Sequence, residues 1–322
     1  MELIRRYYIL EGFSIILNSV VLLSLMMAVG FTAVKTGYIS ADIKNMLSKI
    51  IVKITLPLLI ISSLTEVELS AARIKNSFFV IIFAALIISV LYILGFLASK
   101  ALKLPPQTAL IHRCMTAFGN IVFLGYPLIQ ALYGADGLFY AALYAFVNDI
   151  FVWTFVVWKL NCLNGGATDK KQSLKNCLNP PTAAFGISFL MLIFGIHLTG
   201  PAKELFEGIG GTTTYLSMIF IGGTLAEVKL SEIIKSAPVL LIVIFKMVLM
   251  PLMLIFIMRL LPFDEMVKGV VVMQAAVPSQ TIISVLTKEY GGDTKYVAKA
   301  IFITTILGLF TMPFIYYIMS SV

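Results

Sequence analysis

The chain of 322 residues is 60% hydrophobic and only 12% charged, and its mean hydropathy is +0.99. Soluble globular domains carry roughly 25% charged and about 45–50% apolar residues, so this composition excludes a water-soluble fold and predicts an integral membrane protein. The net charge of +8 does not indicate nucleic-acid binding. The Lys and Arg residues lie almost wholly between apolar segments, where such residues contact anionic lipid and set the topology.

Ten apolar segments follow one another along the chain, each about as long as the 17–25 residues that cross a bilayer as a helix. The first comes after Arg5 and Arg6, as in a signal peptide, but its full spanning length and the many segments that follow identify it as a transmembrane helix. The segments lie near residues 13–34, 46–64, 77–99, 107–132, 138–158, 182–199, 209–226, 237–260, 267–288 and 297–319.

The longest connection runs from Lys159 to Pro181 and carries the loop and helix-start signals Asn164-Gly165-Gly166 and Asn179-Pro180-Pro181. It divides the chain into a first five-helix repeat (1–160), a loop (161–181) and a second five-helix repeat (182–322). Because five is an odd number, two homologous halves must lie in the membrane with opposite topology. Such inverted repeats are typical of secondary transporters.

Lys and Arg residues are divided unequally between alternate loops, with seven on one side and fifteen on the other. The positive-inside rule places the richer side in the cytoplasm, so we expect a cytoplasmic central loop and two external termini in the cell membrane. The seven are Arg5, Arg6, Arg73, Lys75, Lys203, Arg259 and Lys268; the fifteen are Lys35, Lys44, Lys49, Lys53, Lys100, Lys103, Lys159, Lys170, Lys171, Lys175, Lys229, Lys235, Lys288, Lys295 and Lys299.

A short sequence echo supports the division into two halves. The fourth segment ends in Tyr133-Gly134-Ala135-Asp136, and the ninth ends in Tyr290-Gly291-Gly292-Asp293, 157 positions later. The two motifs stand at the same helix of each half, which gives them more weight than four residues alone would have.

The fourth and ninth segments are both interrupted. Pro278 lacks a backbone donor and breaks the ninth segment, whereas Gly119 and Gly125 loosen the fourth, with Pro127 as a further break. Interruptions in corresponding places of two halves indicate a transporter's substrate site, because each resuming half-helix presents free N–H groups and partial positive charge to an anion. The residues predicted to bind substrate are Gly119, Asn120, Pro278, Ser279, Gln280 and Thr281. The alternative is a pair of kinked helices whose polar side chains only bond to neighbouring helices.

These motifs resemble those of a known family. Gly119-Asn120 through Gly125-Tyr126-Pro127-Leu128, together with Ala275-Ala276-Val277-Pro278-Ser279-Gln280 through Tyr290-Gly291-Gly292-Asp293, resemble the paired signature of the auxin efflux carrier family. The likeness covers essentially the whole chain and is greatest to the bacterial branch described as malate or malonate permeases. It implies a five-plus-five inverted-repeat fold whose fourth and ninth helices cross as broken helices. It also implies a mobile bundle that slides against a scaffold of the first, second, sixth and seventh helices.

Two departures from the plant auxin carriers make auxin itself a poor prediction for the substrate. Those carriers have a proline directly before the asparagine of the fourth helix, where this chain has Gly119. The central loop is also far shorter than that of the long plant carriers.

Two ionisable residues fall near mid-membrane, where charges are costly and functional by default. Asp149, beside Asn148 in the fifth segment, is a candidate for loading and releasing a proton; Lys246 in the eighth is a candidate fixed positive charge that balances the substrate or replaces a coupling cation. Alternatively, Asp149 is a structural hydrogen-bond partner facing water and Lys246 snorkels to the interface, and the two residues are also candidates to pair with each other. His112 and Arg113, at the start of the fourth segment, are interpreted as interfacial anchors, with an anion gate as the alternative.

The sequence therefore predicts an all-α membrane carrier of ten helices that moves small organic anions, such as dicarboxylates or auxin-like acids, by secondary transport of the elevator type. Proton coupling is expected and no cofactor or metal, and a homodimer is a candidate assembly. An enzyme or an ATP-driven pump is not expected, because the chain lacks a nucleophile–base set, a metal-ligand pattern and a Walker motif.

Two other classes stay open. The first is an ion-coupled carrier of the bile-acid or sodium–proton antiporter type, although sodium sites would require more buried carboxylates than Asp149. The second is a membrane sensor that does not transport, although a sensor would be expected to carry a soluble output domain.

Overall fold

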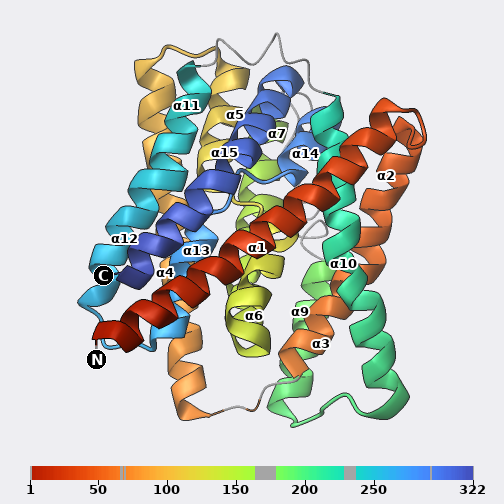
Figure 1. Ribbon diagram of the computed structural model, residues 1–322. Coiled ribbons are helices and arrows are strands. Elements are labelled where there is room, and N and C mark those ends of the chain that lie inside the picture. The colour runs from red at the N-terminus through yellow and green to blue at the C-terminus, as the bar shows by residue number, and fades with distance from the viewer. Residues whose placement is uncertain are drawn as a thin grey trace.

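The computed structural model describes residues 2–65, 68, 70–163, 179–227, 237–290 and 292–321, with side chains from Phe13 onward apart from that of Ala41. It is a bundle of helices (Figure 1). Within these residues the only β-type pairing is one isolated antiparallel bridge between Gly119 and Ser279. Most of the predicted central loop, residues 164–178, lies outside the described part of the chain.

The first half of the chain forms long helices that are interrupted by π-helical turns, which widen the helix locally. In order, these elements are α1 (Glu2–Lys35), α2 (Ala41–Ile50), η1 (Ile51–Thr55), α3 (Leu56–Thr65), α4 (Ala71–Ala101), α5 (Pro106–Ala117), η2 (Ile121–Gly125), α6 (Tyr126–Phe151), η3 (Val152–Val156) and α7 (Val157–Leu163).

The second half also consists of α-helices, with one π-helical turn, η5, among its described elements. Its elements are α9 (Pro180–Ile193), α10 (Gly200–Ala226), α11 (Ala237–Ile242), η5 (Val243–Leu249), α12 (Met250–Arg259), α13 (Glu265–Ala276), α14 (Ile282–Tyr290) and α15 (Thr294–Ser321).

Six helical runs within the described residues are long and apolar enough to cross a membrane, which agrees with an all-α membrane fold. One of them, Ile121–Leu163, is 43 residues long and contains Gly134, whose φ of 61° and ψ of −153° are not helical. This kink lies where the predicted fourth segment gives way to the fifth. The count of ten spans and their inverted repeat stay predictions.

Some predicted boundaries were wrong. The sixth segment was expected to reach residue 199, but α9 ends at Ile193, followed by Gly195 with a φ of 65°. The seventh was expected to begin at 209, but α10 begins at Gly200, with Pro201 in its first turn. A glycine with positive φ often ends a helix, and a proline in the first turn often starts one. Glycine and proline, rather than the hydrophobic pattern, therefore determine these two helix boundaries.

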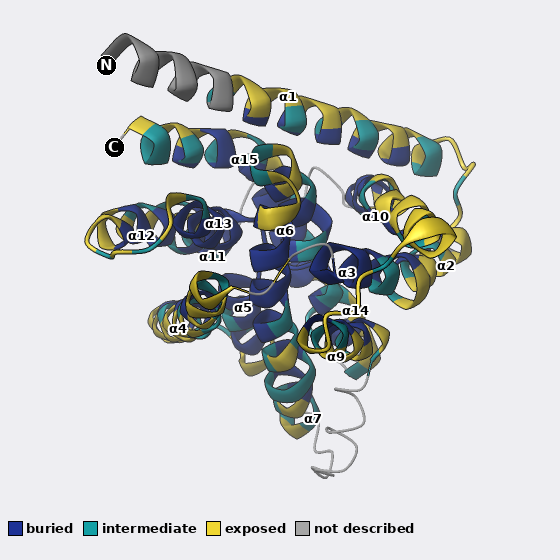
Figure 2. Ribbon diagram, turned by 90° about the horizontal axis from the view of Figure 1, so that it is seen from below, coloured by how far each residue is buried: buried dark blue, intermediate teal, exposed yellow. Residues whose placement is uncertain are grey.

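The helices fall into two neighbourhoods. α10 packs along α1 and against α3, and α3 packs against α9. In the second neighbourhood, α4 packs against α5, α6 and α13, while α13 packs against α6 and α15, and α15 against α5. Seen from below, the buried residues concentrate around α5 and α6 (Figure 2). In Figure 1 both ends of the chain lie on the same side of the bundle as the turn between α12 and α13. The orientation of these ends relative to the membrane stays a prediction.

The contact between α1 and α10 depends on glycine. A methyl group added to Gly222 would overlap the carbonyl of Met27 on α1, and one added to Gly30 would overlap that of Ile219 on α10. Small residues at helix interfaces let backbones approach closely in a membrane, so these glycines hold the two helices together.

We therefore expect Gly222→Ala to destabilise the folded protein by about 1–3 kcal/mol, the usual cost of overpacking. Gly211→Ala is the matched control, because Gly211 lies on the same helix and its added methyl group would meet nothing within 4 Å. Thermal unfolding of both variants in detergent tests this, and equal midpoints for Gly222→Ala and the parent would contradict it.

Candidate functional site

The two predicted helix interruptions meet in space. Helix α5 ends at Ala117 and helical structure resumes at Ile121, while α13 ends at Ala276 and α14 starts at Ile282. The amide N–H of Asn120 donates to the carbonyl of Pro278 at 2.8 Å, and that of Gln280 donates to the carbonyl of Phe118 at 3.1 Å. Each break thus satisfies one backbone N–H and one carbonyl of the other, in a place away from water where such groups need partners.

Gly119 lies where the two breaks are closest. A Cβ atom at this position would come within 2.6 Å of Val277 Cγ2 and 3.3 Å of Lys246 Nζ. The absence of a side chain therefore lets the two extended segments pair.

Two side chains from the second half cap the end of α5. The last carbonyls of a helix have no partner within it. Ser279 Oγ donates to the carbonyl of Met115 at 2.7 Å, and Lys246 Nζ donates to that of Ala117 at 3.4 Å. The ammonium group thus lies at the negative end of the half-helix dipole, where a cation is favoured.

Lys246 is 1% exposed, so the alternative in which it snorkels to the interface is wrong. Its Nζ bonds to a carbonyl, and the ion pairs found among the described residues do not join it to Asp149.

A small cavity of about 50 Å³ lies beside the crossing. Asn120, Gln280 and Thr281 line it from the breaks, and Asp149 lines it from α6. The remaining lining residues are Val52, Leu56, Val122, Phe123, Trp153, Pro181 and Ile282. The positive, N-terminal ends of η2 and α14 therefore both reach this cavity, as does one carboxyl group.

The carboxyl group of Asp149 belongs to an amide network. Asn148 Nδ2 lies 3.1 Å from Gln280 Oε1 and 3.3 Å from Asp149 Oδ1. The network joins α6 of the first half to the ninth-segment break of the second.

Several buried polar atoms near the crossing have no hydrogen-bond partner among the described residues. They include Asn120 Nδ2, Thr281 Oγ1, Asn148 Oδ1 and Tyr126 Oη. Most buried polar groups in proteins are satisfied, so a cluster of exceptions beside a cavity identifies a place for water or a polar ligand.

The structure separates the predicted substrate residues into two groups. Asn120, Gln280 and Thr281 line the cavity, whereas the hydroxyl of Ser279 is bonded to α5 and Gly119 and Pro278 take part through their backbones. Other lining positions, such as Trp153, Val52 and Leu56, carried no signal in the sequence because they are ordinary apolar residues of other segments.

The prediction that Gly125 and Pro127 break the fourth helix was wrong. Helical structure continues from Ile121 through both residues into α6. Pro127 falls in the first turn of α6, directly after a π-helical turn, where a proline is tolerated. Gly125 instead leaves room for the side chain of Gln274, which a methyl group would overlap.

His112 is not an interfacial anchor either. It is fully buried, and its Nδ1 lies 2.7 Å from the hydroxyl of Tyr296 on α15. Nearby, Thr108 donates to Asp293 at 2.7 Å, and Asp293 also caps the first turn of α15. These bonds join the start of α5 to the start of α15. Asp136, the matching residue of the first motif, pairs with Arg73 in the first turn of α4 at 2.9 Å. Each of the two repeated motifs therefore ends in an aspartate that bonds to the first turn of a helix.

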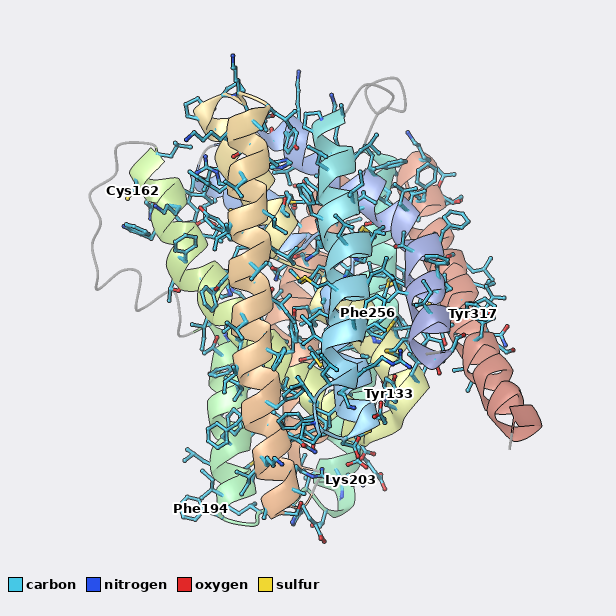
Figure 3. The ribbon with its side chains drawn as sticks, turned by 90° about the vertical axis from the view of Figure 1, so that its left-hand side faces the viewer. Tyr133, Cys162, Phe194, Lys203, Phe256 and Tyr317 are labelled. Atoms are coloured by element: carbon cyan, nitrogen blue, oxygen red, sulfur yellow. The ribbon has the colours of Figure 1, made fainter. Side chains whose placement is uncertain are left out.

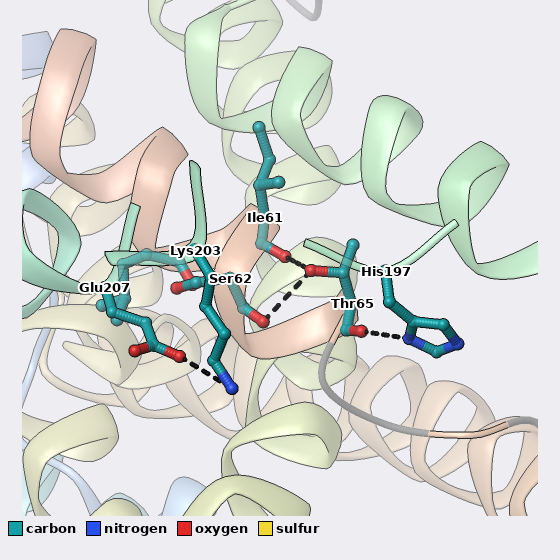
Figure 4. Close-up of polar contacts among 7 residues, drawn as sticks. Ile61, Ser62, Thr65, His197, Lys203 and Glu207 are labelled. Carbon is teal, nitrogen blue, oxygen red and sulfur yellow. Dashed lines mark hydrogen bonds and ion pairs between the residues drawn. The ribbon is translucent and has the colours of Figure 1, made fainter. Parts of the chain in front are cut away.

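A separate cavity of about 620 Å³ lies away from the helix crossing. Its lining residues come from α3, α10 and the kink at Gly134. His197 Nδ1 lies 2.8 Å from the carbonyl of Thr65, and Lys203 pairs with Glu207 at 3.3 Å (Figure 4). Both bonds involve residues that line this cavity.

Stability measurements should separate the capping role of Ser279 from the ligand-facing position of Thr281. Ser279→Ala removes the bond to α5 and should lower the free energy of unfolding by about 1 kcal/mol, or more if the carbonyl stays unsatisfied. Thr281→Val removes a hydroxyl that has no partner among the described residues, so it should leave the free energy of unfolding unchanged or raise it. A larger loss of stability in Thr281→Val than in Ser279→Ala, measured by thermal unfolding, would reverse this assignment.

Comparison with known proteins identifies the family of the chain. A family model described as "Membrane transport protein" matches residues 15–173 and 166–316. An uncharacterised transporter of Methanothermobacter thermautotrophicus is 25% identical over 284 residues, covering 88% of this chain and 92% of its own. An uncharacterised transporter of Methanocaldococcus jannaschii is 24% identical over 306 residues, covering 91% and 95%. The chain therefore belongs to the auxin efflux carrier family of membrane transport proteins.

Proposed function

We propose that this protein is a secondary active carrier of small organic anions, with dicarboxylates such as malate or malonate as the first class to test. The observation that carries the proposal is the cavity at the crossing, where two half-helix N-termini meet side-chain donors that have no partner in the described part of the chain.

Anion binding follows from the chemistry of that cavity. The first N–H groups of a helix have no intrahelical acceptor and carry partial positive charge. No side chain caps η2 at Asn120, and the amide nitrogen of the Asn120 side chain is buried without a partner among the described residues. The hydroxyl of Thr281 is a further donor. A carboxylate of the substrate would satisfy these groups together.

Asp149 supplies the coupling in this proposal. It lines the same small cavity, and two negative charges close together in a low-dielectric site repel strongly. Binding of an anion therefore favours the protonated form of Asp149, and protonation in turn favours the anion, since linkage is reciprocal. Proton and anion would then cross together, down the proton gradient.

The size of the cavity requires movement. A volume of about 50 Å³ accommodates one carboxylate group or a water molecule, so a whole dicarboxylate needs the walls to separate. Val52, Leu56 and Pro181 form one wall, from η1, α3 and α9; η1 and α3 pack against α10, and α9 packs against both of them. We propose that this group is the scaffold of a ten-helix inverted repeat and that the crossing moves against it, in the manner of an elevator, within the cell membrane.

Sodium coupling, as in carriers of the bile-acid type, is the second candidate. The observation in its favour is the oxygen set beside Asp149, in which Asn148 Oδ1 and Thr281 Oγ1 have no partner among the described residues. Proteoliposome uptake with pH and sodium gradients imposed separately distinguishes the two ions.

For the substrate site, we expect Asn120→Ala and Gln280→Ala each to weaken binding of the transported acid by about two- to tenfold, because each removes one contact worth about 0.5–1.5 kcal/mol. The two effects should be non-additive in a double-mutant cycle, since both side chains would contact one ligand. Counterflow with labelled organic acids measures this. The control is Gln107→Ala, because Gln107 lines a separate cavity, which also contains Asp293. Parent-like binding in both variants would place the site elsewhere.

For the coupling, Asp149→Asn should abolish accumulation of substrate driven by a pH gradient and preserve exchange of substrate for substrate. The amide is close in size to the carboxyl group but cannot take up a proton in the pH range of a transport assay. Accumulation by this variant equal to that of the parent, under the same imposed gradient, would remove Asp149 from the mechanism.

A further inference from the structure

Three buried hydroxyl groups occur on two elements that pack together, η1 and α10. Thr55, Thr213 and Ser217 are no more than 3% exposed, and their hydroxyls have no hydrogen-bond partner among the described residues. Other hydroxyls nearby are satisfied by their own helix: Thr65 on α3 and Thr224 on α10 donate to the carbonyls four residues earlier, at 2.7 and 2.9 Å. Most buried polar groups in proteins find a partner, so these three are exceptions that need an explanation.

The two elements run antiparallel, side by side (Figure 1). At one end of their contact, a methyl group added to Gly210 on α10 would overlap the backbone of Leu59 on α3. At the other end, Lys44 on α2 pairs with Glu227, directly after α10. Lower residue numbers on α2, η1 and α3 therefore face higher numbers on α10.

This register brings the three hydroxyls to one level. Leu59 follows Thr55 by one turn on the same face of its helix, and Ile51, one turn before Thr55, belongs to a core cluster with residues of α10. Thr55 therefore faces α10. Thr213 and Ser217 follow the glycine that touches Leu59 by three and seven residues, so they lie on the same face of α10. Thr55 thus lies opposite the turn between Thr213 and Ser217.

The π-helical turn adds a fourth polar group. The N–H of Leu56 donates to the carbonyl of Ile51, five residues earlier. The carbonyl of Val52 would accept from Leu56 in an α-helix and from residue 57 in a π-helix. Residue 57 is a proline, which has no N–H. The carbonyl of Val52 is therefore left without either donor, in the same turn as Thr55.

These groups lie deep in the bundle and close to the crossing. Lys203, near the start of α10, lies at the end of the bundle opposite Cys162 (Figure 3), and the two hydroxyls of α10 stand about halfway along that helix. Val52 and Leu56, on a neighbouring face of η1 and α3, line the cavity at the crossing. The four polar groups are thus behind one wall of that cavity.

We propose that a water molecule is bound between η1 and α10, where it joins the hydroxyls of Thr55, Thr213 and Ser217 to the carbonyl of Val52 and so fixes this wall of the crossing cavity. A buried water typically makes about three hydrogen bonds to groups that would otherwise be unsatisfied. Water both donates and accepts, so it suits hydroxyls and a carbonyl together. A sodium ion would contact only the oxygen atoms and would leave the hydroxyl protons without acceptors.

The first test is X-ray footprinting of the full-length protein in detergent and in water labelled with heavy oxygen. Irradiation of a bound water produces hydroxyl radicals in place, and these oxidise methionine to its sulfoxide. Met218, directly after Ser217, is 0% exposed, and Met250 on α12, at 2%, is the equally buried control. We expect Met218 to gain the label several times faster than Met250, and this difference to disappear in Thr213→Val. Equal rates in the parent protein would overturn the proposal.

The second test is the sign of the change in stability. Thr55→Val, Thr213→Val and Ser217→Ala should each lower the midpoint of thermal unfolding, and their effects should be non-additive because all three contact one water. Thr212→Val is the matched control, since this exposed hydroxyl of α10 donates to the carbonyl of its own helix, and it should change the midpoint little.

Two results of the second test would contradict a bound water. Without it, each of the three substitutions removes an unsatisfied hydroxyl, so the midpoint would stay the same or rise. A midpoint that rises with sodium but not with potassium, and no longer does so in Thr213→Val, would assign the groups to a cation instead. None of these measurements requires transport, so the proposed carrier function is tested separately.

Discussion

The structure depends on the mutual satisfaction of two broken helices. Each break frees backbone groups in the interior, where an unsatisfied N–H or C=O costs several kcal/mol in an apolar medium. Here the breaks bond to each other through Asn120, Pro278, Phe118 and Gln280. Because one break belongs to the first half of the chain and the other to the second, neither half can form its site alone.

The helix ends that meet at the crossing differ in whether their polar groups have partners, and this difference favours an anion. The C-terminal end of α5 is saturated by Ser279 and Lys246, so its negative dipole is compensated. The N-terminal ends of η2 and α14 keep unpartnered donors within the described residues and reach the same cavity. Positive potential is thus left at one face of the crossing, with Asp149 beside it. A pair of kinked helices that only joined neighbouring helices would not require a buried lysine at the end of α5 and a carboxyl group in the cavity.

Much of this could be predicted from the sequence. Pro278 and the polar residues after it located the ninth-segment break, because a proline inside an apolar span removes a backbone donor and interrupts the helix at that point. The repeated Tyr-Gly-x-Asp motif indicated matching positions, and the structure shows both aspartates at helix starts. Family membership follows from the same motifs.

The features that could not be predicted from the sequence depend on contacts between residues that are far apart in the chain. Gly125 and Pro127 have the composition of a helix break, yet the helix continues, since a π-turn accommodates the proline and Gln274 requires the glycine. Ser279 and Thr281 are two residues apart and chemically alike, but one caps α5 and the other faces the cavity. His112 looked interfacial because it stands near the end of its segment, and only the packing of α15 shows that it is buried. Such distinctions arise from partners that lie far away in the chain.

The central claim, that an anion and a proton share the cavity at the crossing, is tested most directly by the number of protons taken up on binding. Titration calorimetry of malonate or malate in buffers of different ionisation enthalpy gives this number. The account predicts uptake of close to one proton at neutral to alkaline pH, lost in Asp149→Asn while the anion still binds. Anion binding with no proton uptake at any pH in this range, or uptake that persists in Asp149→Asn, would contradict it.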